Sequence, residues 1–442
     1  MTLTTGAAWA QSGAEIVLEE SLPECRCYRV DAILIEGLLR TRRQVVEREL
    51  LFVEGDIATI EEVEESVQRL RNTGLFRVVE YELVDRRVQA YDEGVQSPLE
   101  LNESRVLRVT VDERWTIMPN FRFSRGGDSF QFIVGLQDAN LLGSYLQLGG
   151  QYARLGDANS FALWFRNPRF LNERLILSLD VSYGNRTFTL YDREGLREGG
   201  FTRNRRFVGM SLEREWLRWL RSGLHLSLMG DEYSYAFISE PMQELQESSS
   251  GLPDPSNALN FALSSRIGRV DYDSYRMSGT QLNLRLTQSL DLGGLVAQYT
   301  QAEAYLFRYW TLPLKSTFGV RLGLGTTSSR ETHHLFYAGG LDAVRGTYDM
   351  RFRGPYFSLV NTELRVPSLD TAWVVVQHVF FADTVGVSPY PNELFQISAA
   401  SAGVGLRIIS PKIYGFIMRF DYAFSIHNAE GPGLSYGAGQ FF

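Results

Sequence analysis

The feature that most constrains this chain is a long series of segments, filling residues 114–442, in which apolar and polar residues alternate. In residues 173–184, for example, Leu177 and Leu179 share one face of an extended chain, while Ser178 lies on the other. Successive side chains of a β-strand point to opposite faces, so each segment predicts a strand with one apolar face and one polar, water-facing face. Segments of about ten residues are long enough for a tilted membrane strand. The sequence therefore predicts an all-β transmembrane barrel.

We expect the barrel to contain about sixteen antiparallel strands. The expected strands are 116–124, 130–138, 145–154, 159–166, 173–184, 203–213, 220–232, 259–272, 278–289, 297–308, 315–325, 357–366, 373–384, 400–409, 414–424 and 434–442. Long connections are expected at 185–202, 233–258 and 326–356, whereas turns such as Gly126-Gly127-Asp128 are short. Outer-membrane barrels have short turns at the periplasmic end and longer loops at the exterior end, which agrees with this alternation.

Composition agrees with a barrel and disfavours other classes. Aromatic residues make up 12% of the 442 residues and glycine numbers 40, which suits strands with an amphipathic outer surface. The most apolar run, 372–387, is interrupted by Gln377, His378 and Asp383 and is too polar for a spanning helix. The formal net charge is -8 and there is no basic stripe, so no nucleic-acid partner is expected.

No catalytic or metal-binding motif is recognised. The sequence contains no G-x-S-x-G, H-E-x-x-H or P-loop pattern, so we expect neither enzymatic activity nor a cofactor. His333 and His334 are expected at a strand end, where adjacent side chains point in opposite directions, which disfavours a metal site. Cys25 and Cys27 have no further soft ligands nearby, and both unpaired and locally paired thiols stay open.

Residues 1–27 form an N-terminal extension. Ala8-Trp9-Ala10 has the A-x-A pattern of a signal-peptide cleavage site, but the charged region and most of the apolar region that precede such a site are missing. We interpret the extension as the remnant of a signal peptide that begins upstream. An ordinary unstructured terminus is the alternative.

Residues 28–113 predict a small α+β domain. Thr41 with Gln44, and Thr59 with Glu62, have the spacing of capping boxes at the starts of two helices. The expected elements, in order, are a strand at 28–38, a helix from Thr41 to Gly55, a helix from Thr59 to Gly74, and strands at 76–84 and 105–112.

This domain resembles a POTRA (polypeptide-transport-associated) domain. The resemblance rests on Val30–Gly37, on the Gly55-Asp56 turn and above all on Leu70-Arg71-Asn72-Thr73-Gly74-Leu75-Phe76, where a helix end, a glycine cap and a strand start coincide. One such domain is recognised in the chain.

The barrel segments contain motifs in a fixed order: Gly135–Gly143, Phe165–Phe170, Gly339–Gly346, Asn361–Pro367, Phe380–Thr384 and Ser401–Arg407. Together they resemble the superfamily of BamA-like outer-membrane assembly factors and two-partner-secretion transporters. The resemblance covers nearly the whole chain.

In this family the loop that carries the Val344-Arg345-Gly346 motif folds back into the lumen, which implies an in-folded loop at 326–356. A guanidinium in a narrow lumen is stable only if it is paired. The resemblance and the strand order point to Asp383 as the carboxylate partner of Arg345, with Glu363 as the second candidate. The alternative is that Arg345 is one more luminal arginine.

Glycines allow such a loop to enter and turn. Gly339 and Gly340 would let the loop enter the lumen, and Gly346 would let the backbone turn closely beside the arginine. The family usually has an aromatic residue where this chain has Thr347, which leaves the packing of the loop tip open.

The end of the chain resembles an outer-membrane sorting strand through Ser435, Gly437 and Phe442, although Gln440 stands where an aromatic is commoner. Closing the barrel means pairing 434–442 with 116–124, and Gly437 and Gly439 would weaken packing at that seam. The resemblance implies a seam that opens sideways and offers strand edges to a client.

The resemblance implies a bacterial-type outer-membrane protein that inserts or translocates client polypeptides, with the POTRA domain in the periplasm. Its expected partners are unfolded or nascent outer-membrane or secreted proteins, the lipid bilayer and periplasmic accessory proteins. The alternatives are a two-partner-secretion-type exporter of one exoprotein and a passive outer-membrane channel. A third class, an anchor for a secreted enzyme, is disfavoured because we expect no enzyme domain before residue 28.

Overall fold

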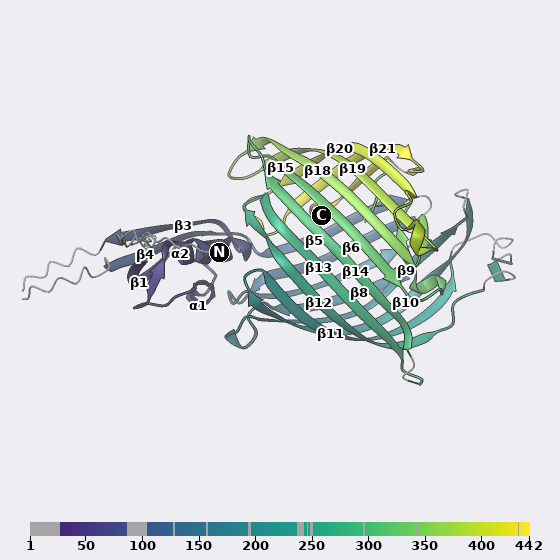
Figure 1. The fold of residues 1–442 in the computed structure, drawn as a ribbon, viewed down its shortest axis with the longest axis horizontal. Coiled ribbons are helices and arrows are strands. Elements are labelled where there is room, and N and C mark those ends of the chain that lie inside the picture. The colour runs from purple at the N-terminus through teal and green to yellow at the C-terminus, as the bar shows by residue number, and fades with distance from the viewer. Residues whose placement is uncertain are drawn as a thin grey trace, which may run out of the picture.

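The chain forms a small mixed α/β domain at one end of a large β-barrel (Figure 1). Residues 1–26 of the predicted N-terminal extension, including Cys25, lie outside the described residues, whereas Cys27 is bonded in a disulfide. The computed structural model describes residues 27–85, 104–126, 129–155, 158–192, 196–236, 243–244, 246–247, 251–294, 297–340, 343–431 and 433–442.

The first domain is a four-stranded sheet packed against two helices. Its elements are β1 (Cys27–Glu36), α1 (Arg43–Glu47), β2 (Ile57–Thr59), α2 (Ile60–Asn72), β3 (Phe76–Asp85) and β4 (Ser104–Glu113). The strand order is β2-β1-β4-β3, with β1 and β4 parallel at the centre. Val46 of α1 and Val67 and Leu70 of α2 are buried in one core with the strands. The predicted order of elements is present, with the short β2 added.

Helix α2 begins where the sequence predicts. The hydroxyl of Thr59 accepts a hydrogen bond from the backbone N–H of Glu62 (3.1 Å), and the Glu62 carboxylate accepts one from the N–H of Thr59 (2.9 Å). This capping box satisfies two of the helix's free donors. At the other end Gly74 adopts a left-handed φ of 73°, which lets the chain turn into β3.

The first helix is present, but the predicted cap and extent of this helix are wrong. Helix α1 starts at Arg43 without a side-chain cap and ends at Glu47. The hydroxyl of Thr41, expected to cap this helix, instead accepts a hydrogen bond from the side-chain amide of Asn140 in the barrel (2.9 Å). A tertiary contact therefore uses the group that the local pattern assigned to a cap.

Sixteen antiparallel strands form the barrel sheet, the number predicted. They are β5 (Ile117–Gly126), β6 (Ser129–Leu141), β7 (Leu146–Leu155), β8 (Ala158–Asn167), β9 (Leu175–Tyr191), β10 (Arg197–Leu217), β11 (Leu220–Tyr235), β12 (Ser256–Asp273), β13 (Arg276–Asp291), β14 (Ala297–Thr311), β15 (Thr317–Thr327), β18 (Tyr356–Asp370), β19 (Val375–Ser388), β20 (Ala399–Ile409), β21 (Ile417–His427) and β22 (Leu434–Ala438). Each strand pairs with its neighbours in the chain, and β15 pairs with β18 across the long connection between them.

The alternation of the sequence appears as one apolar outer face. Leu179 and Val181 of β9 and Leu286 of β13 are exposed, as expected for side chains that contact lipid. One predicted connection, 185–202, is mostly strand, because β9 and β10 stay paired as far as Tyr191 and Arg197. No helix in the described part of the chain is long and apolar enough to cross a membrane.

The two end strands of the sheet, β5 and β22, share no backbone pairing among the described residues. Strand β22 has five residues and pairs with β21 alone. Beside the first domain, Trp115, just before β5, instead bonds to the connection between β20 and β21, since its N–H donates to Lys412 O (2.8 Å) and its carbonyl accepts from Tyr414 N–H (2.9 Å). The predicted pairing of 434–442 with 116–124 is therefore not made in the part of the chain that the structure describes, and we call this unpaired boundary between β5 and β22 the open seam.

A buried charge network joins the first domain to the barrel. Glu49, which is 1% exposed, accepts two hydrogen bonds from Arg169 in the β8–β9 connection (2.7 and 2.6 Å). Arg169 also donates to Glu215 of β10 (3.1 Å). Burial alone would lower the pKa of Arg169, but the charge and hydrogen bonds of Glu49, assisted by Glu215, raise it. Arg169 therefore stays charged at the junction.

Helix α2 makes a second set of contacts with the β12–β13 end of the barrel. The side-chain amide of Asn72 donates to Asp271 (2.8 Å) and accepts from the N–H of Tyr272 (3.0 Å). Arg269 pairs with both oxygens of Glu65, one of them at 3.0 Å. These contacts hold α2 at the end of the lumen.

We expect Glu65→Gln to loosen this docking without unfolding either part. Glutamine removes the charge that faces Arg269, which keeps Asp271 as a partner at 2.6 Å, so the expected cost is about 1 kcal/mol. The distribution of distances between spin labels on the first domain and on the barrel, measured by electron paramagnetic resonance, should broaden. Glu61→Gln, exposed on the same helix, is the matched control, and identical distributions in both variants would contradict the assignment.

Candidate functional site

The connection between β15 and β18 folds back and crosses the barrel lumen. It contains the 3₁₀ turn η2 (Thr332–His334) and a hairpin of β16 (Phe336–Ala338) and β17 (Phe352–Gly354). On one side Val344 packs in a cluster with Leu359 of β18 and Val385 of β19. On the other, Met350 packs with Phe188 of β9. Strands β9 and β19 lie eight positions apart in the sixteen-stranded sheet, so the loop reaches nearly opposite walls.

Glycines permit this path. Gly339, Gly340 and Gly346 have φ values of 141°, 58° and 82°, in the region that other residues rarely adopt. A Cβ on Gly339 would lie 2.3 Å from the carbonyl oxygen of Tyr348, and one on Gly346 would lie 2.8 Å from the Cβ of Ala423. The backbone can approach itself and strand β21 this closely only without side chains.

Thr347, where the family pattern has an aromatic, ties the loop to itself. Its hydroxyl donates to the carbonyl of Val344 (2.7 Å) and accepts from the N–H of Gly340 (2.7 Å). Thr347 is buried, whereas Tyr348 is 49% exposed. The departure in sequence thus supplies two hydrogen bonds that connect the chain before Arg345 to the residue two positions after it.

Arg345 is 1% exposed and holds two carboxylates. Its Nε and Nη2 donate to the two oxygens of Asp383 (2.7 and 2.9 Å), and its Nη1 donates to Glu363 (2.6 Å). The backbone N–H of Arg345 also donates to Asp383 (3.2 Å). The bidentate geometry gives a strong, oriented bond between the loop tip and the wall. The structure thus brings together all three residues that the sequence singled out.

The pairing extends into a network that sequence reasoning missed. Arg407 of β20 donates to Glu363 (3.1 Å) and to Asp421 of β21 (2.6 Å), and Arg365 donates to the other oxygen of Glu363 (2.8 Å). Glu363, Arg365 and Arg407 are each at most 1% exposed. Glu363 and Arg365, like Arg419 and Asp421, are opposite charges two residues apart on one strand face. This spacing of opposite charges, repeated on the last strands, is the sequence pattern that could have predicted the network.

Two aromatic rings cover the guanidinium of Arg345. Its Cζ lies 3.5 Å from the ring centre of Phe381 and 3.9 Å from that of Phe441. A desolvated contact of this kind contributes about 2 kcal/mol, and the rings also exclude water from the ion pairs. Phe441 belongs to the chain terminus, so the end of the chain is part of the site.

The chain leaves the barrel wall before its end. Ser435 and Gly437 lie in β22, opposite Asp421 and Arg419, but the strand ends at Ala438. Gly439 then adopts a φ of 81°, and the last residues turn into the lumen. The predicted terminal strand is therefore wrong for its last four residues, and this turn accounts for the short β22 and the open seam.

Phe442 lies inside the lumen. Its ring stacks on that of Tyr309 with 6.2 Å between centroids, and its main-chain oxygen accepts a hydrogen bond from Arg365 (2.8 Å). Arg365 therefore connects the chain end to Glu363 and, through it, to Arg345. Among the described residues, no group of His, Cys, Asp and Glu side chains is arranged to hold a metal ion.

Comparison with known families agrees with this fold. Residues 140–442 match the Omp85 superfamily domain, and residues 28–114 match a POTRA domain described as a surface antigen variable number repeat. These findings define an outer-membrane β-barrel with a POTRA domain. Because the first match spans more than half of the chain, this protein belongs to the Omp85 superfamily, whose members are membrane-embedded transporters or insertases of polypeptides.

Solved structures share the fold at low sequence identity. BamA from Haemophilus ducreyi lacking POTRA domains 1-3 aligns with a TM-score of 0.50 and 19% identity, over 93% of this chain and 83% of that one. CdiB from Acinetobacter baumannii aligns at 0.55 and 13%, over 93% and 73% of the two chains. CdiB from Escherichia coli aligns at 0.54 and 13%, over 94% and 90%. No curated protein matches the sequence. The predicted family and fold class are confirmed.

We expect Thr347→Val to weaken the loop without changing the strands of the barrel. Valine keeps the volume but leaves the buried N–H of Gly340 without its acceptor, at a cost of about 1–3 kcal/mol. Limited proteolysis of the loop and hydrogen exchange at Gly340 should both accelerate. Tyr348→Phe, at an exposed neighbouring side chain, should behave as the unaltered protein, and equal exchange in the two variants would contradict the role of Thr347.

Proposed function

We propose that this protein inserts or translocates client polypeptides at the outer membrane, with the POTRA domain in the periplasm. The observation that carries the proposal is an open seam beside a lumen crossed by a loop that Arg345 pins to the wall. A diffusion channel would need a clear lumen, so the crossing loop disfavours a passive pore. Assignment of residues 28–113 and 114–442 as receiving and membrane domains is part of the same proposal.

In this proposal the client first binds the POTRA sheet by adding a strand. Strand β3, with ten residues, is at one edge of the sheet, whereas β2 at the other edge has three. A long edge strand presents unpaired backbone groups that can accept an extended peptide. We therefore assign the receiving edge to β3.

The client then reaches the seam between β5 and β22. Five-residue β22 leaves most of the β5 edge without a partner among the described residues, which suits lateral insertion into lipid. Export through the lumen, as in a two-partner-secretion-type exporter, is the second candidate, favoured by the structural likeness to CdiB. It requires the loop to leave, whereas insertion does not.

We expect Arg345→Ala to abolish client handling. Removing one partner of a buried ion pair costs about 3–5 kcal/mol, because Asp383 loses its bidentate partner, whereas Glu363 keeps Arg365 and Arg407. The measurement is integration of a labelled outer-membrane protein by proteoliposomes that contain this protein. Arg353→Ala, in the partly exposed pair with Glu198, is the control.

Charge reversal refines that experiment. Arg345→Asp combined with Asp383→Arg should restore part of the activity lost in either single variant. Restoration is partial because the new aspartate faces Glu363, which pairs with the native arginine at 2.6 Å. Unchanged client integration by both single variants would contradict the proposal that the Arg345–Asp383 pair, by holding the loop to the wall, is needed for client handling.

A disulfide across the seam separates the two routes. In a background with Cys25 and Cys27 replaced by serine, cysteine pairs placed between 117–119 and 434–437 should block insertion when oxidised. A pair at Leu177 and Leu212, directly opposite on the already paired β9 and β10, is the control. Full activity with a locked seam would exclude lateral insertion and leave passage through the lumen.

A further inference from the structure

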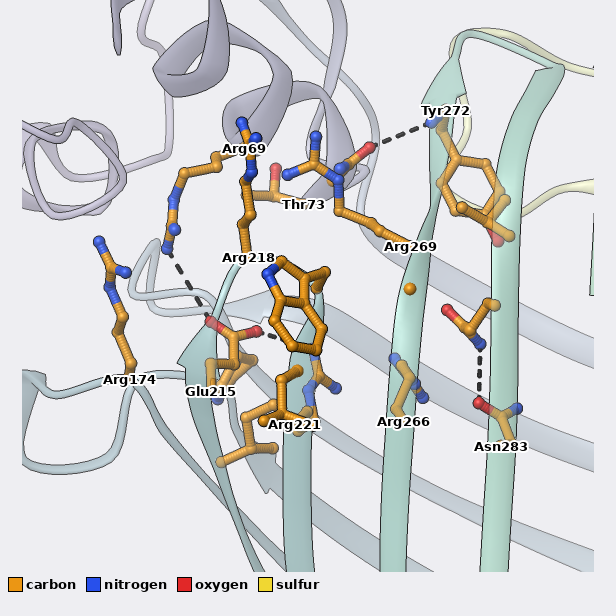
Figure 2. A pocket seen from close by; sticks show the side chains of 18 of the residues that line it. Arg69, Thr73, Arg174, Glu215, Arg218, Arg221, Arg266, Arg269, Tyr272 and Asn283 are labelled. Atoms are coloured by element: carbon orange, nitrogen blue, oxygen red, sulfur yellow. Dashed lines mark hydrogen bonds and ion pairs between the residues drawn. The ribbon is translucent and has the colours of Figure 1, made fainter. Parts of the chain in front are cut away.

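A cavity of about 440 Å³ lies between the POTRA domain and the adjoining end of the lumen (Figure 2). Helix α2 contributes Arg69 and Asn72 to its lining, Thr73 follows directly after this helix, and the barrel contributes side chains from β7 to β14. Phe442, at the end of the chain, lines it from the lumen side. A polypeptide moving from the POTRA domain toward the barrel interior would meet this cavity before the Arg345 network.

The lining is basic, although the whole chain has a formal net charge of -8. Eight arginines line the cavity, against two glutamates, Glu49 and Glu215. Three further carboxylates pair with the same arginines from outside the lining. With these five carboxylates counted, an excess of three positive charges is left. Because the cavity is partly enclosed, each of these charges acts more strongly on a ligand than it would in bulk water.

The excess comes from four arginines that form no ion pair within the described ranges: Arg166, Arg174, Arg218 and Arg266. The Nε of Arg166 is buried and has no hydrogen-bond partner there. Desolvation and the nearby Arg69 lower the pKa of Arg174, as expected where cations outnumber anions. Guanidinium groups stay charged in proteins, so these groups can be neutralised only by an added anion.

These arginines are distributed around the cavity. Arg166 belongs to β8, Arg174 precedes β9, Arg218 lies in the β10–β11 turn and Arg266 belongs to β12. Figure 2 shows Arg174 and Arg266 on different elements and apart from each other. A compact anion such as phosphate is held by donors that converge on one point. Separate donors fit an extended ligand with several carboxylates.

Aromatic side chains lie among the arginines. Trp219, Tyr272 and Tyr309 also line the cavity. Flat aromatic surfaces contact the backbone and apolar parts of a peptide without requiring one sequence, while the arginines select negative charge. The combination suits a passing chain of varied sequence better than one small molecule.

We propose that this cavity binds acidic segments of a client polypeptide between the POTRA domain and the barrel interior. The identity of the ligand as a client rests on the proposed function, but the binding step needs no transport. The site selects clients by charge, and the Arg345 network is not part of it.

The test uses the full chain in lipid nanodiscs and a short fluorescent peptide rich in glutamate, with its glutamine counterpart. We expect the glutamate peptide to bind, and we expect added salt to weaken its binding. Its affinity should exceed that of the glutamine peptide by tenfold or more, which is about the contribution of one charge-assisted hydrogen bond. The double variant Arg166→Gln/Arg266→Gln should lose most of that binding. Neither arginine has a carboxylate partner among the residues that the structure describes, so the variant removes none of the ion pairs seen there and should fold.

Arg186→Gln/Arg203→Gln is the matched control, because it removes the same charge beside Phe188, away from the cavity lining. Equal binding of the two peptides, or unaltered binding in Arg166→Gln/Arg266→Gln, would overturn the proposal. Displacement of the peptide by inorganic phosphate at equal charge would overturn it in favour of a small-anion site. Peptide binding without client integration would count against the proposed function and leave this inference standing.

Discussion

The structure depends on one buried guanidinium. Arg345 is nearly inaccessible to solvent and would be costly to bury alone, so the loop position is stable only where carboxylates meet it. Asp383 and Glu363 stand two strand residues apart in register, since Asn361 opposes Asp383 and Glu363 opposes Phe381. The side-chain amide of Asn361 also donates to Asp383 and to the carbonyl of Ala343 (both 2.8 Å), which orients the acceptor. The wall and loop therefore position each other.

The same network reaches the seam. Phe441 covers Arg345, and Phe442 is bonded to Arg365, which is bonded to Glu363. These contacts hold the chain end in the lumen and away from β5. Disturbing the Arg345 pairs would release both the loop and the chain end, so one set of ion pairs acts on the lumen and on the seam. The basic cavity adjoins this network, and Phe442 lies at the boundary between the cavity and the network.

Local patterns predicted much of this architecture. Period-two alternation predicted a sixteen-stranded sheet because lipid and water impose opposite demands on the two faces. The capping box at Thr59 predicted helix α2 because its hydrogen bonds are local. The same argument failed at Thr41, whose hydroxyl bonds to Asn140, ninety-nine residues away. The Val344-Arg345-Gly346 motif and the strand order indicated Asp383 as the partner of Arg345. Arg407 and Asp421 belong to the same charge network because of the pairing register of the later strands, which the sequence alone did not reveal.

The sequence by itself determined the class of fold, the strand number and the need of Arg345 for a carboxylate. Only the tertiary structure decided that Gly439 turns the chain end inward, that β22 stops after five residues and that β5 and β22 are unpaired over their described residues. It also decided that arginines from four separate elements surround one cavity at the POTRA domain. Alternation specifies which face a side chain occupies, whereas burial of charge and long-range pairing depend on which strands close around it.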